Sequence, residues 1–499
     1  VWLIYGFFVL LYQDKLPFNP DDNPGMTPDL AFNTIISFVA NCNLQHYSGE
    51  SGVSYLSQQF VLMFLQFVSA ATGIAAAVVL FKAFRDETST LLGNFWEFFV
   101  KSITRLLLPL SIVIALLLTF NGTPASYEGK DQFISIQGDT LNVSRGPAAQ
   151  MIAIKHLGTN GGGYFGVNSA HPLENPSYFT NMVEMIAQTI IPIAMVICFG
   201  YFIRRKKLGW TIFGLMTIGM LLLMIPSLTS ELGGNPTLAK MGIAQTTGAM
   251  EGKEVRFGPA ATAYWSTLTT IISTGSVNGM HDSTMPLTGL WQLLGMMING
   301  LYGGCGVGIL NYFIYLIIAV FISGLMVGRT PEFLGHKVEA REIKIAALIT
   351  LLSPFLILAG TALASYTFTN NGNADWAVQP QNWLNNPGFH GFSEMLYEVT
   401  SSNANNGSGF EGLGDNNMFW NILTGVIIFL GRFLPIIGPI AIAGLLAKKK
   451  FIPESAGTLK TDTKTFALMT FAVILVLNAL SYFPALALGP IAEYFTMLK

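Results

Sequence analysis

The chain has 499 residues, of which 51% are apolar and only 11% are charged, and its formal net charge at pH 7 is −2. In soluble domains about a quarter of the residues are charged, so the composition excludes an ordinary soluble protein and indicates an integral membrane protein. A disulfide framework is not predicted, because the three cysteines, Cys42, Cys198 and Cys305, are few and widely separated.

Nine apolar runs are candidates for spans across a hydrocarbon layer of about 30 Å, which requires roughly 20 residues. The first run begins VWLIYGFFVL, without Met or a basic stretch, so we interpret it as a truncated transmembrane helix with residues missing upstream and not as a signal peptide. The nine runs cover residues 1–13, 58–82, 102–120, 182–203, 208–228, 304–328, 345–367, 418–446 and 465–489.

The loops between these runs alternate strictly between short and long. Most of the 26 Lys and Arg residues lie in or beside the short loops. Cytoplasmic loops of membrane proteins carry an excess of Lys and Arg. The short loops are therefore predicted to face the cytoplasm and the long loops the outside.

Each long loop contains a moderately apolar segment of about ten residues, which is too short to cross a bilayer and is typical of a re-entrant half-helix. Each segment is followed at once by a polar turn rich in Gly and Asn, such as GTNGGGYF after the second one. The four segments are residues 30–39, 148–157, 262–272 and 391–401.

The four turns align as an internal repeat of roughly 120 residues, each unit consisting of a span, a half-helix, a turn and a second span. An even number of crossings in each unit keeps every copy the same way up. The aligned triplets are Asn41-Cys42-Asn43, Thr159-Asn160-Gly161, Ser273-Thr274-Gly275 and Asn405-Asn406-Gly407. The predicted fold is an all-α polytopic membrane protein with repeats at 1–84 (first helix truncated), 97–205, 208–329 and 343–447, followed by a C-terminal transmembrane helix and tail at 464–499.

The triplets suit an ion site made of backbone oxygens. Irregular backbone at membrane depth persists only where it is buried in protein or lines a water-filled cavity, and rings of carbonyls can replace the hydration shell of a cation. Gly permits the strained dihedral angles that such a ring requires. Carboxylates would suit Ca²⁺ or Mg²⁺, and none occurs in the triplets. One such turn alone is typical of a surface loop, but four copies after four half-helices favour a site for K⁺ or a near relative.

Longer motifs support this interpretation and connect the chain with a known family. They are YSGESGVSYLSQ, GTNGGGYFGVNSAHPLENP, MEGKEVRFG, VNGMHDS, GLMVGRTPEFLG, NNGSGFEGL and FPALALGPIAEYF. Over essentially its whole length, the chain resembles the potassium-binding A subunit of the bacterial Kdp complex, an ATP-driven potassium pump. The resemblance implies the fold of the superfamily of K⁺ transporters, with four M1-P-M2 repeats and re-entrant pore helices around a pseudo-fourfold axis, plus one helix at each end. Nine of the ten expected spans are present, and the missing one is the first.

The resemblance also assigns roles to residues. It implies that the four triplets form the K⁺ filter, with Gln45 beside the first, and Cys42 departs from the family pattern because Thr is expected there. The family also has an interrupted helix below the filter in the third repeat. In this chain the corresponding segment is GLYGGCGVG, which is either that gate or a helix-packing face of small residues. Its glycines are Gly303, Gly304, Gly306 and Gly308.

The chain contains neither a GxxxxGK[ST] loop nor the DKTGT phosphorylation sequence, so it is not predicted to hydrolyse ATP. A membrane potential of about 100 mV supplies only about 2.3 kcal/mol per charge, and uptake of trace K⁺ needs a further energy source. The resemblance supplies one. It implies a P-type ATPase partner (the B-type subunit), two small subunits (C- and F-type), K⁺ as the bound ion, and a bacterial inner membrane with the filter facing outward.

Two alternatives come from other classes of protein. A K⁺ channel or ion-coupled uptake protein of the related Trk type shares the general pattern but not the long motifs. An intramembrane metalloenzyme would use His46, His171 and His281, which follow three of the turns but lack the close spacing of zinc ligands.

Arg432 is the one basic residue deep within a predicted span. Such a residue is costly in a bilayer and usually marks a pathway or a buried partner. We expect Arg432 to face the conduction path, and the alternative is that its side chain snorkels to an interface.

Overall fold

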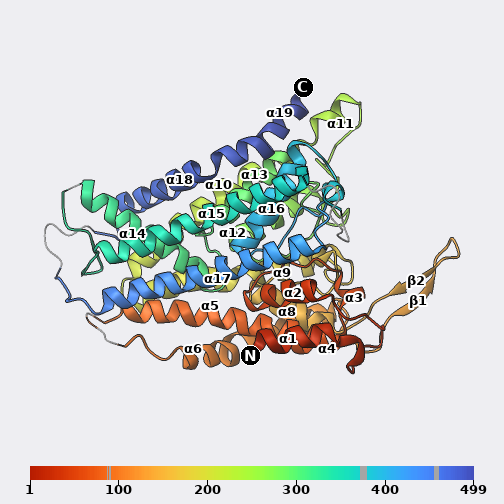
Figure 1. The fold of residues 1–499 in the computed structure, drawn as a ribbon, viewed down its shortest axis with the longest axis horizontal. Coiled ribbons are helices and arrows are strands. Elements are labelled where there is room, and N and C mark those ends of the chain that lie inside the picture. Colours follow the sequence, from red (N-terminus) through yellow and green to blue (C-terminus); the bar gives the residue numbers. More distant parts are fainter. Residues whose placement is uncertain (87, 89–90, 327, 371–378, 454–459) are drawn as a thin grey trace.

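The computed structural model describes residues 1–86, 88, 91–326, 328–370, 379–453 and 460–499. Most of these residues belong to long helices that run side by side along the longest axis of the molecule (Figure 1). Among the described residues, eight helices are long and apolar enough to cross a membrane. They correspond to the eight predicted spans that follow the first one, which are thereby confirmed.

Three of the eight are composite helices in which a π-helical turn joins two α-helical parts. In chain order, the elements of the eight helices are α4 (Tyr55–Ser57) with η2 (Gln58–Met63) and α5 (Phe64–Ala83); α6 (Phe95–Ser102) with η3 (Ile103–Leu107) and α7 (Leu108–Phe120); α9 (Tyr178–Phe202); α10 (Lys206–Gly233); α14 (Val307–Met326); α15 (Ala340–Asn370); α17 (Met418–Ala447); and α18 (Lys464–Leu486) with η6 (Ala487–Ile491) and α19 (Ala492–Leu498). The first predicted span is the short apolar helix α1 (Trp2–Leu11).

The four predicted half-helices are also present. Each packs between the two helices that flank it in its repeat, for example α8 between α7 and α9, and α16 between α15 and α17. Two of them, α2 and α12, begin with Pro in the first turn, where its missing N–H costs no hydrogen bond. The half-helices are α2 (Pro28–Val39), α8 (Ala148–Leu157), α12 (Gly258–Ile272) and α16 (Phe389–Ala404).

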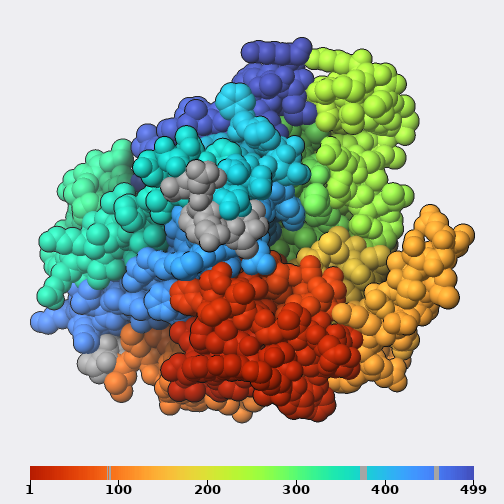
Figure 2. All heavy atoms as spheres, turned by 45° about the vertical axis from the view of Figure 1, so that its right-hand side comes forward, coloured from red at the N-terminus to blue at the C-terminus, as the bar shows by residue number. Residues whose placement is uncertain are grey.

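The repeats follow one another around a closed arrangement. Helix α5 of the first repeat contacts α8 of the second, α9 of the second contacts α12 of the third, and α13 of the third contacts α16 of the fourth. Contacts between α2 and α17 bring the fourth repeat back to the first. In Figure 2 the N-terminal segment lies directly against the fourth repeat. The fold is therefore four M1-P-M2 repeats around a pseudo-fourfold axis, with a terminal helix added at the C-terminal end.

The third repeat differs from the others because its second membrane helix is interrupted. Helix α13 (Pro286–Ile298) ends at Asn299, and α14 begins only at Val307. The predicted span at 304–328 therefore starts three residues too early and misses α13, whose 13 residues are too few to span.

The remaining elements are short and lie in the loops. A hairpin projects beyond one end of the helix bundle, formed by β1 (Asp131–Ile134) and β2 (Thr140–Val143) (Figure 1). A second, smaller hairpin consists of β3 (Glu332–Phe333) and β4 (His336–Lys337). The other elements are η1 (Gln13–Lys15), α3 (Gly49–Gly52), η4 (Asn168–Ala170), α11 (Pro236–Lys240) and η5 (Pro380–Asn382).

Candidate functional site

The four polar turns share one backbone conformation. The first residue of each triplet is left-handed, with φ of 61° at Asn41, 50° at Thr159, 60° at Ser273 and 53° at Asn405. This conformation is unfavourable for residues other than Gly by roughly 1–2 kcal/mol, so other interactions must stabilise it. In every copy, the second residue donates its N–H to the carbonyl five residues earlier. These bonds run from Cys42 to Ser37 (2.8 Å), Asn160 to Lys155 (2.9 Å), Thr274 to Thr269 (2.9 Å) and Asn406 to Ser401 (2.9 Å).

The third position of the triplet brings neighbouring turns into direct contact. Gly161, Gly275 and Gly407 have φ of 83°, 86° and 91°. A Cβ on Gly161 would lie 1.8 Å from the Thr274 carbonyl oxygen, and a Cβ on Gly275 would lie 1.9 Å from that of Asn406. At Gly407 it would lie 2.3 Å from the Asn43 backbone. The second turn therefore contacts the third, the third the fourth, and the fourth the first.

Side-chain amides join the first turn to the second and complete a ring. Asn41 Nδ2 donates to the carbonyls of Gly158 (3.1 Å) and Thr159 (3.2 Å), and Asn160 Nδ2 donates to that of Cys42 (3.1 Å). Asn43 Nδ2 also donates to the carbonyl of Gly275, at 2.6 Å. The structure thus brings all twelve predicted triplet residues together, although they are spread over more than 360 positions of the chain.

The ring is buried and carries no ionisable carboxylate. The non-glycine triplet residues are at most 5% exposed, and Asn43 Oδ1 and Thr274 Oγ1 are buried with no hydrogen-bond partner in the described part of the chain. The C-terminal ends of α2, α8, α12 and α16 all lead into the ring, and the negative ends of their dipoles favour a cation there. Gln45 lies beside the ring, where its side chain both accepts from and donates to Gly163, at 2.9 and 3.2 Å.

Lys155 supports the second turn from behind and was not identified from the sequence. Its side chain is fully buried, pairs with the Glu174 carboxylate and donates to Asn168 Oδ1 (2.5 Å). Asn168 Nδ2 in turn donates to the Gly161 carbonyl, at 2.9 Å. In the other repeats, the equivalent positions are Ser37, Thr269 and Ser401. The lysine therefore makes the support of the second turn different from the rest.

The break between α13 and α14 lies against the second turn. The Cys305 N–H donates to Thr159 Oγ1, at 2.9 Å. Gly303, Gly304 and Gly306 have φ of 39°, 82° and 80°, so this segment is not a helical packing face. A Cβ on Gly306 would lie 2.1 Å from the Gly73 carbonyl oxygen.

The fourth predicted gate residue, Gly308, belongs to the first turn of α14 instead of the break. A Cβ there would lie 1.9 Å from the carbonyl oxygen of Tyr302. The backbone of the break at Tyr302 therefore packs directly against the first turn of α14 at Gly308.

Arg432 of α17 is buried at the same level. Its side chain is 6% exposed, and its Nη2 has no hydrogen-bond partner among the described residues. Nη2 lies 3.5 Å from the position of a Cβ on Gly73, and that position is 2.2 Å from the Cys305 carbonyl oxygen in the break. It therefore does not snorkel to an interface, and it places a positive charge beside the helix break.

The three histidines of the metalloenzyme alternative do not meet. His46 faces Glu398 and Asn421. His171 stacks on Phe165 with the ring centres 3.9 Å apart, and His281 pairs with the Tyr397 hydroxyl at 2.9 Å.

A separate charged cluster joins the third repeat, the fourth repeat and the C-terminal helix. His390 lies between Asp282 Oδ1 (2.9 Å) and Glu493 Oε1 (2.8 Å), and Glu394 lies 3.9 Å away. Burial alone would lower the pKa of His390, but the hydrogen bonds to Asp282 and Glu493 raise it to about 10. Burial and the charge of Asp282 raise the pKa of Glu394 to about 7. Both shifts favour the protonated forms of His390 and Glu394.

The fold and the ring define a polytopic membrane transporter with four pore-type repeats around a central axis. The chain belongs to the family of potassium-transporting ATPase A subunits, whose family model matches residues 1–495. This is the family predicted from the sequence motifs. Relatives bear the name of the potassium-binding subunit and not that of a catalytic one, so the ATPase activity lies on a partner chain. Membership of this family excludes both the Trk-type and the metalloenzyme alternatives.

Individual relatives agree along the whole chain. The potassium-transporting ATPase potassium-binding subunit of Flavobacterium johnsoniae is 67% identical, covering 100% of this chain and 87% of its own length. The subunits of Phocaeicola vulgatus and Geobacillus kaustophilus are 59% and 46% identical, each over 99% of this chain and over 87% and 86% of their own lengths.

The crystal structure of the potassium transporter TrkH from Vibrio parahaemolyticus is similar in fold. Its TM-score is 0.55 at 15% sequence identity, and the match covers 87% of this chain and 82% of that one. At this identity the likeness concerns the fold alone.

Proposed function

We propose that the ring of four turns is a K⁺ filter, in which backbone and neutral side-chain oxygens of the twelve triplet residues replace the water around the ion. The observation that carries the proposal is the fourfold repetition of one unusual backbone conformation, closed into a ring by contacts between successive turns. Neutral oxygens suit a weakly hydrated cation that must also be released. Gln45 assists by fixing the segment that leaves the first turn.

Below the filter, the broken helix and Arg432 are proposed to control passage. The segment from Asn299 to Gly306 lies directly against Thr159 and includes three glycines with positive φ. Gly308, at the start of α14, fixes one end of this segment. The buried charge of Arg432 opposes free movement of cations beyond the break. The filter and the barrier together would let K⁺ enter without flowing through.

A cavity next to the break, with both polar and apolar lining residues, suggests how K⁺ leaves the chain sideways. It lies among α14, α15, α17 and α18, and it reaches Asn299 at the start of the break. Amide and hydroxyl groups suited to a cation line it, namely those of Asn299, Asn311, Thr350, Ser353, Asn403, Asn478, Ser481 and Tyr482. We propose that K⁺ passes from the filter through this side of the molecule to the P-type ATPase subunit.

The proposed setting is the bacterial inner membrane, where the chain assembles with the P-type ATPase subunit and the two small single-span subunits. The loops that carry most Lys and Arg face the cytoplasm, so the half-helices and the filter open outward. The repeat units predicted from the sequence, at 1–84, 97–205, 208–329 and 343–447, are proposed as the structural units of this site.

Uptake by the reconstituted complex tests the function. Proteoliposomes that contain the whole complex should accumulate K⁺ only when ATP is supplied, and those that contain this chain alone should not. A chain that conducts K⁺ by itself down its gradient, without ATP and without partners, would instead support a channel.

Replacing Arg432 tests the barrier. Arg432→Met removes the buried charge and keeps an apolar side chain, so we expect ATP hydrolysis to become uncoupled from K⁺ accumulation, with leakage of K⁺ from loaded proteoliposomes. The leak rate of the complex without ATP is the measurement. Arg105→Met, on an exposed helical face, is the control. Unchanged uptake kinetics and no leak in Arg432→Met would contradict the assignment.

A further inference from the structure

The first repeat departs from the other three at the third triplet position. Asn43 stands where they have glycine, and it does not share the positive φ of Gly161, Gly275 and Gly407. The chain therefore leaves the first turn in a different direction. A Cβ on Gly407 would lie 2.3 Å from the Asn43 backbone, so the exit of the first turn lies directly against the fourth turn.

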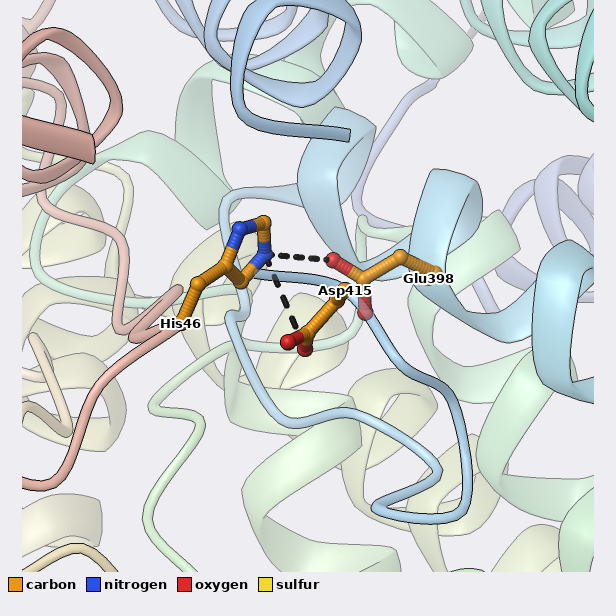
Figure 3. Close-up of side chains that lie close together, drawn as sticks. All are labelled: His46, Glu398 and Asp415. Carbon is orange, nitrogen blue, oxygen red and sulfur yellow. Dashed lines mark hydrogen bonds and ion pairs between the residues drawn. The ribbon is translucent and has the colours of Figure 1, made fainter. Parts of the chain in front are cut away.

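His46 holds this exit segment to the fourth repeat. It follows Asn43 by three residues and is 4% exposed. Its Nε2 lies 3.2 Å from Glu398 Oε1 on α16 and 3.8 Å from Asp415 Oδ2 in the loop before α17 (Figure 3). Its Nδ1 lies 2.6 Å from Asn421 Oδ1 on α17.

The hydrogen-bond partners of the His46 imidazole determine its protonation state. Asn421 Nδ2 donates to Asp29 Oδ2 at 2.7 Å, which leaves the amide oxygen of Asn421 to face His46. An amide oxygen only accepts, so Nδ1 carries a proton. Nε2 faces two carboxylates, which also accept, so it carries a proton too.

The charged groups around His46 support the same state. Glu398 lies on α16, Asp415 in the loop before α17, and Asp29 at the start of α2 behind Asn421. Burial lowers the pKa of His46, but the charges of Asp415 and Glu398 raise it to about 9. Among the described residues, the charged groups that face the His46 imidazole are both carboxylates, Glu398 and Asp415.

We propose that His46 is a positioning residue of the ion site, a buried imidazolium that fixes the first turn, whose triplet contains no glycine, against the fourth turn. The inference rests on the proposed filter. Asn43 donates its N–H to the Asn406 carbonyl at 3.3 Å, and Glu398 stands on the half-helix that ends at Asn405. The ion pair therefore joins the two segments that carry adjacent filter oxygens.

This role sets the affinity for K⁺ and not the rate of ATP hydrolysis. If the first turn is released, its oxygens no longer keep the spacing that suits K⁺, so the ring binds K⁺ more weakly and discriminates less between K⁺ and Rb⁺. The catalytic cycle of the partner is unaffected once the ion is bound. A purely structural role would lower the yield or the maximal rate instead.

The test is the K⁺ concentration that half-activates the ATPase of the purified complex. In His46→Gln we expect it to rise about tenfold or more, since a hydrogen bond to a charged group contributes about that factor, while the maximal rate stays within about twofold. His46→Lys, which keeps the charge, should recover much of the affinity. His171→Gln, at the stacked histidine outside this junction, is the control.

A double-mutant cycle separates the ion pair from general damage. Glu398→Gln should resemble His46→Gln, and the double variant should be no worse than either single one, because both remove the same interaction. Additive losses, or wild-type affinity in His46→Gln, would overturn the proposal. So would a divalent metal bound in wild-type complex and lost in His46→Gln, because the cluster would then be a metal site. A wild-type complex that is not activated by K⁺ would refute the proposed function itself.

Discussion

Gly161→Ala in the second turn is expected to raise the K⁺ concentration for half-maximal ATPase activity by about 100-fold, the equivalent of losing one or two contacts to a charged group. Gly161 has a φ of 83°, which side chains disfavour. The added Cβ would lie 1.8 Å from the Thr274 carbonyl oxygen and 2.7 Å from the Ser276 nitrogen. Because both atoms belong to the backbone of the neighbouring turn, the third turn must move. Gly161→Asp, which adds a charge, should abolish activation by K⁺ altogether.

The matched control is Gly138→Ala in the turn between β1 and β2. Gly138 has a similar φ of 93° but open space around its Cβ position. This variant bears the same backbone strain without the contact, and we expect wild-type affinity. Wild-type activation of both Gly161 variants would remove the second turn from the ion site.

Lys155→Met is expected to have the largest effect on stability. The lysine is fully buried and pairs with Glu174, close to a second buried carboxylate on Glu184. Removal of one partner of a buried ion pair costs about 3–5 kcal/mol because the other charge remains without compensation. The variant should lower the thermal unfolding temperature of the purified complex markedly. It should also weaken K⁺ binding, because Asn168 would no longer be held against the Gly161 carbonyl.

Two further variants define the cause. Lys155→Met combined with Glu174→Gln removes both charges and should recover part of the lost stability. Lys101→Met, in an exposed pair with Glu97, should change the stability by less than about 1 kcal/mol. Equal effects of the buried and exposed variants would show that the Lys155 network does not support the turn.

The bilayer explains why most of the architecture could be predicted. Hydrocarbon thickness fixes the length of each span, and the cost of unpaired backbone groups confines polar turns to protected places. The runs at 182–203 and 418–446 therefore matched α9 and α17 closely, and all four half-helices were found. Helix α13 was missed because its 13 residues are too few for a span and are followed by the glycine-rich break, whereas α14 beyond the break is by itself long and apolar enough to cross the membrane.

The supporting residues could not be predicted in the same way. Lys155 is a single basic residue in a short apolar helix, and nothing nearby in the sequence shows that Glu174 and Asn168 fold back onto it. His46 depends on Glu398 and Asp415, more than 350 positions away. The triplets were found because they repeat, whereas each of these contacts occurs in one repeat only.

In the proposed filter, oxygens of four successive turns surround one K⁺. The most direct test is a structure of the complete complex with Tl⁺ in place of K⁺, in which anomalous scattering locates the ion independently of the protein. The ion should lie on the axis of the ring, coordinated by oxygens from all four triplets and displaced by excess K⁺. Tl⁺ bound elsewhere in the chain, with the ring collapsed and free of ions at saturating concentration, would contradict the account.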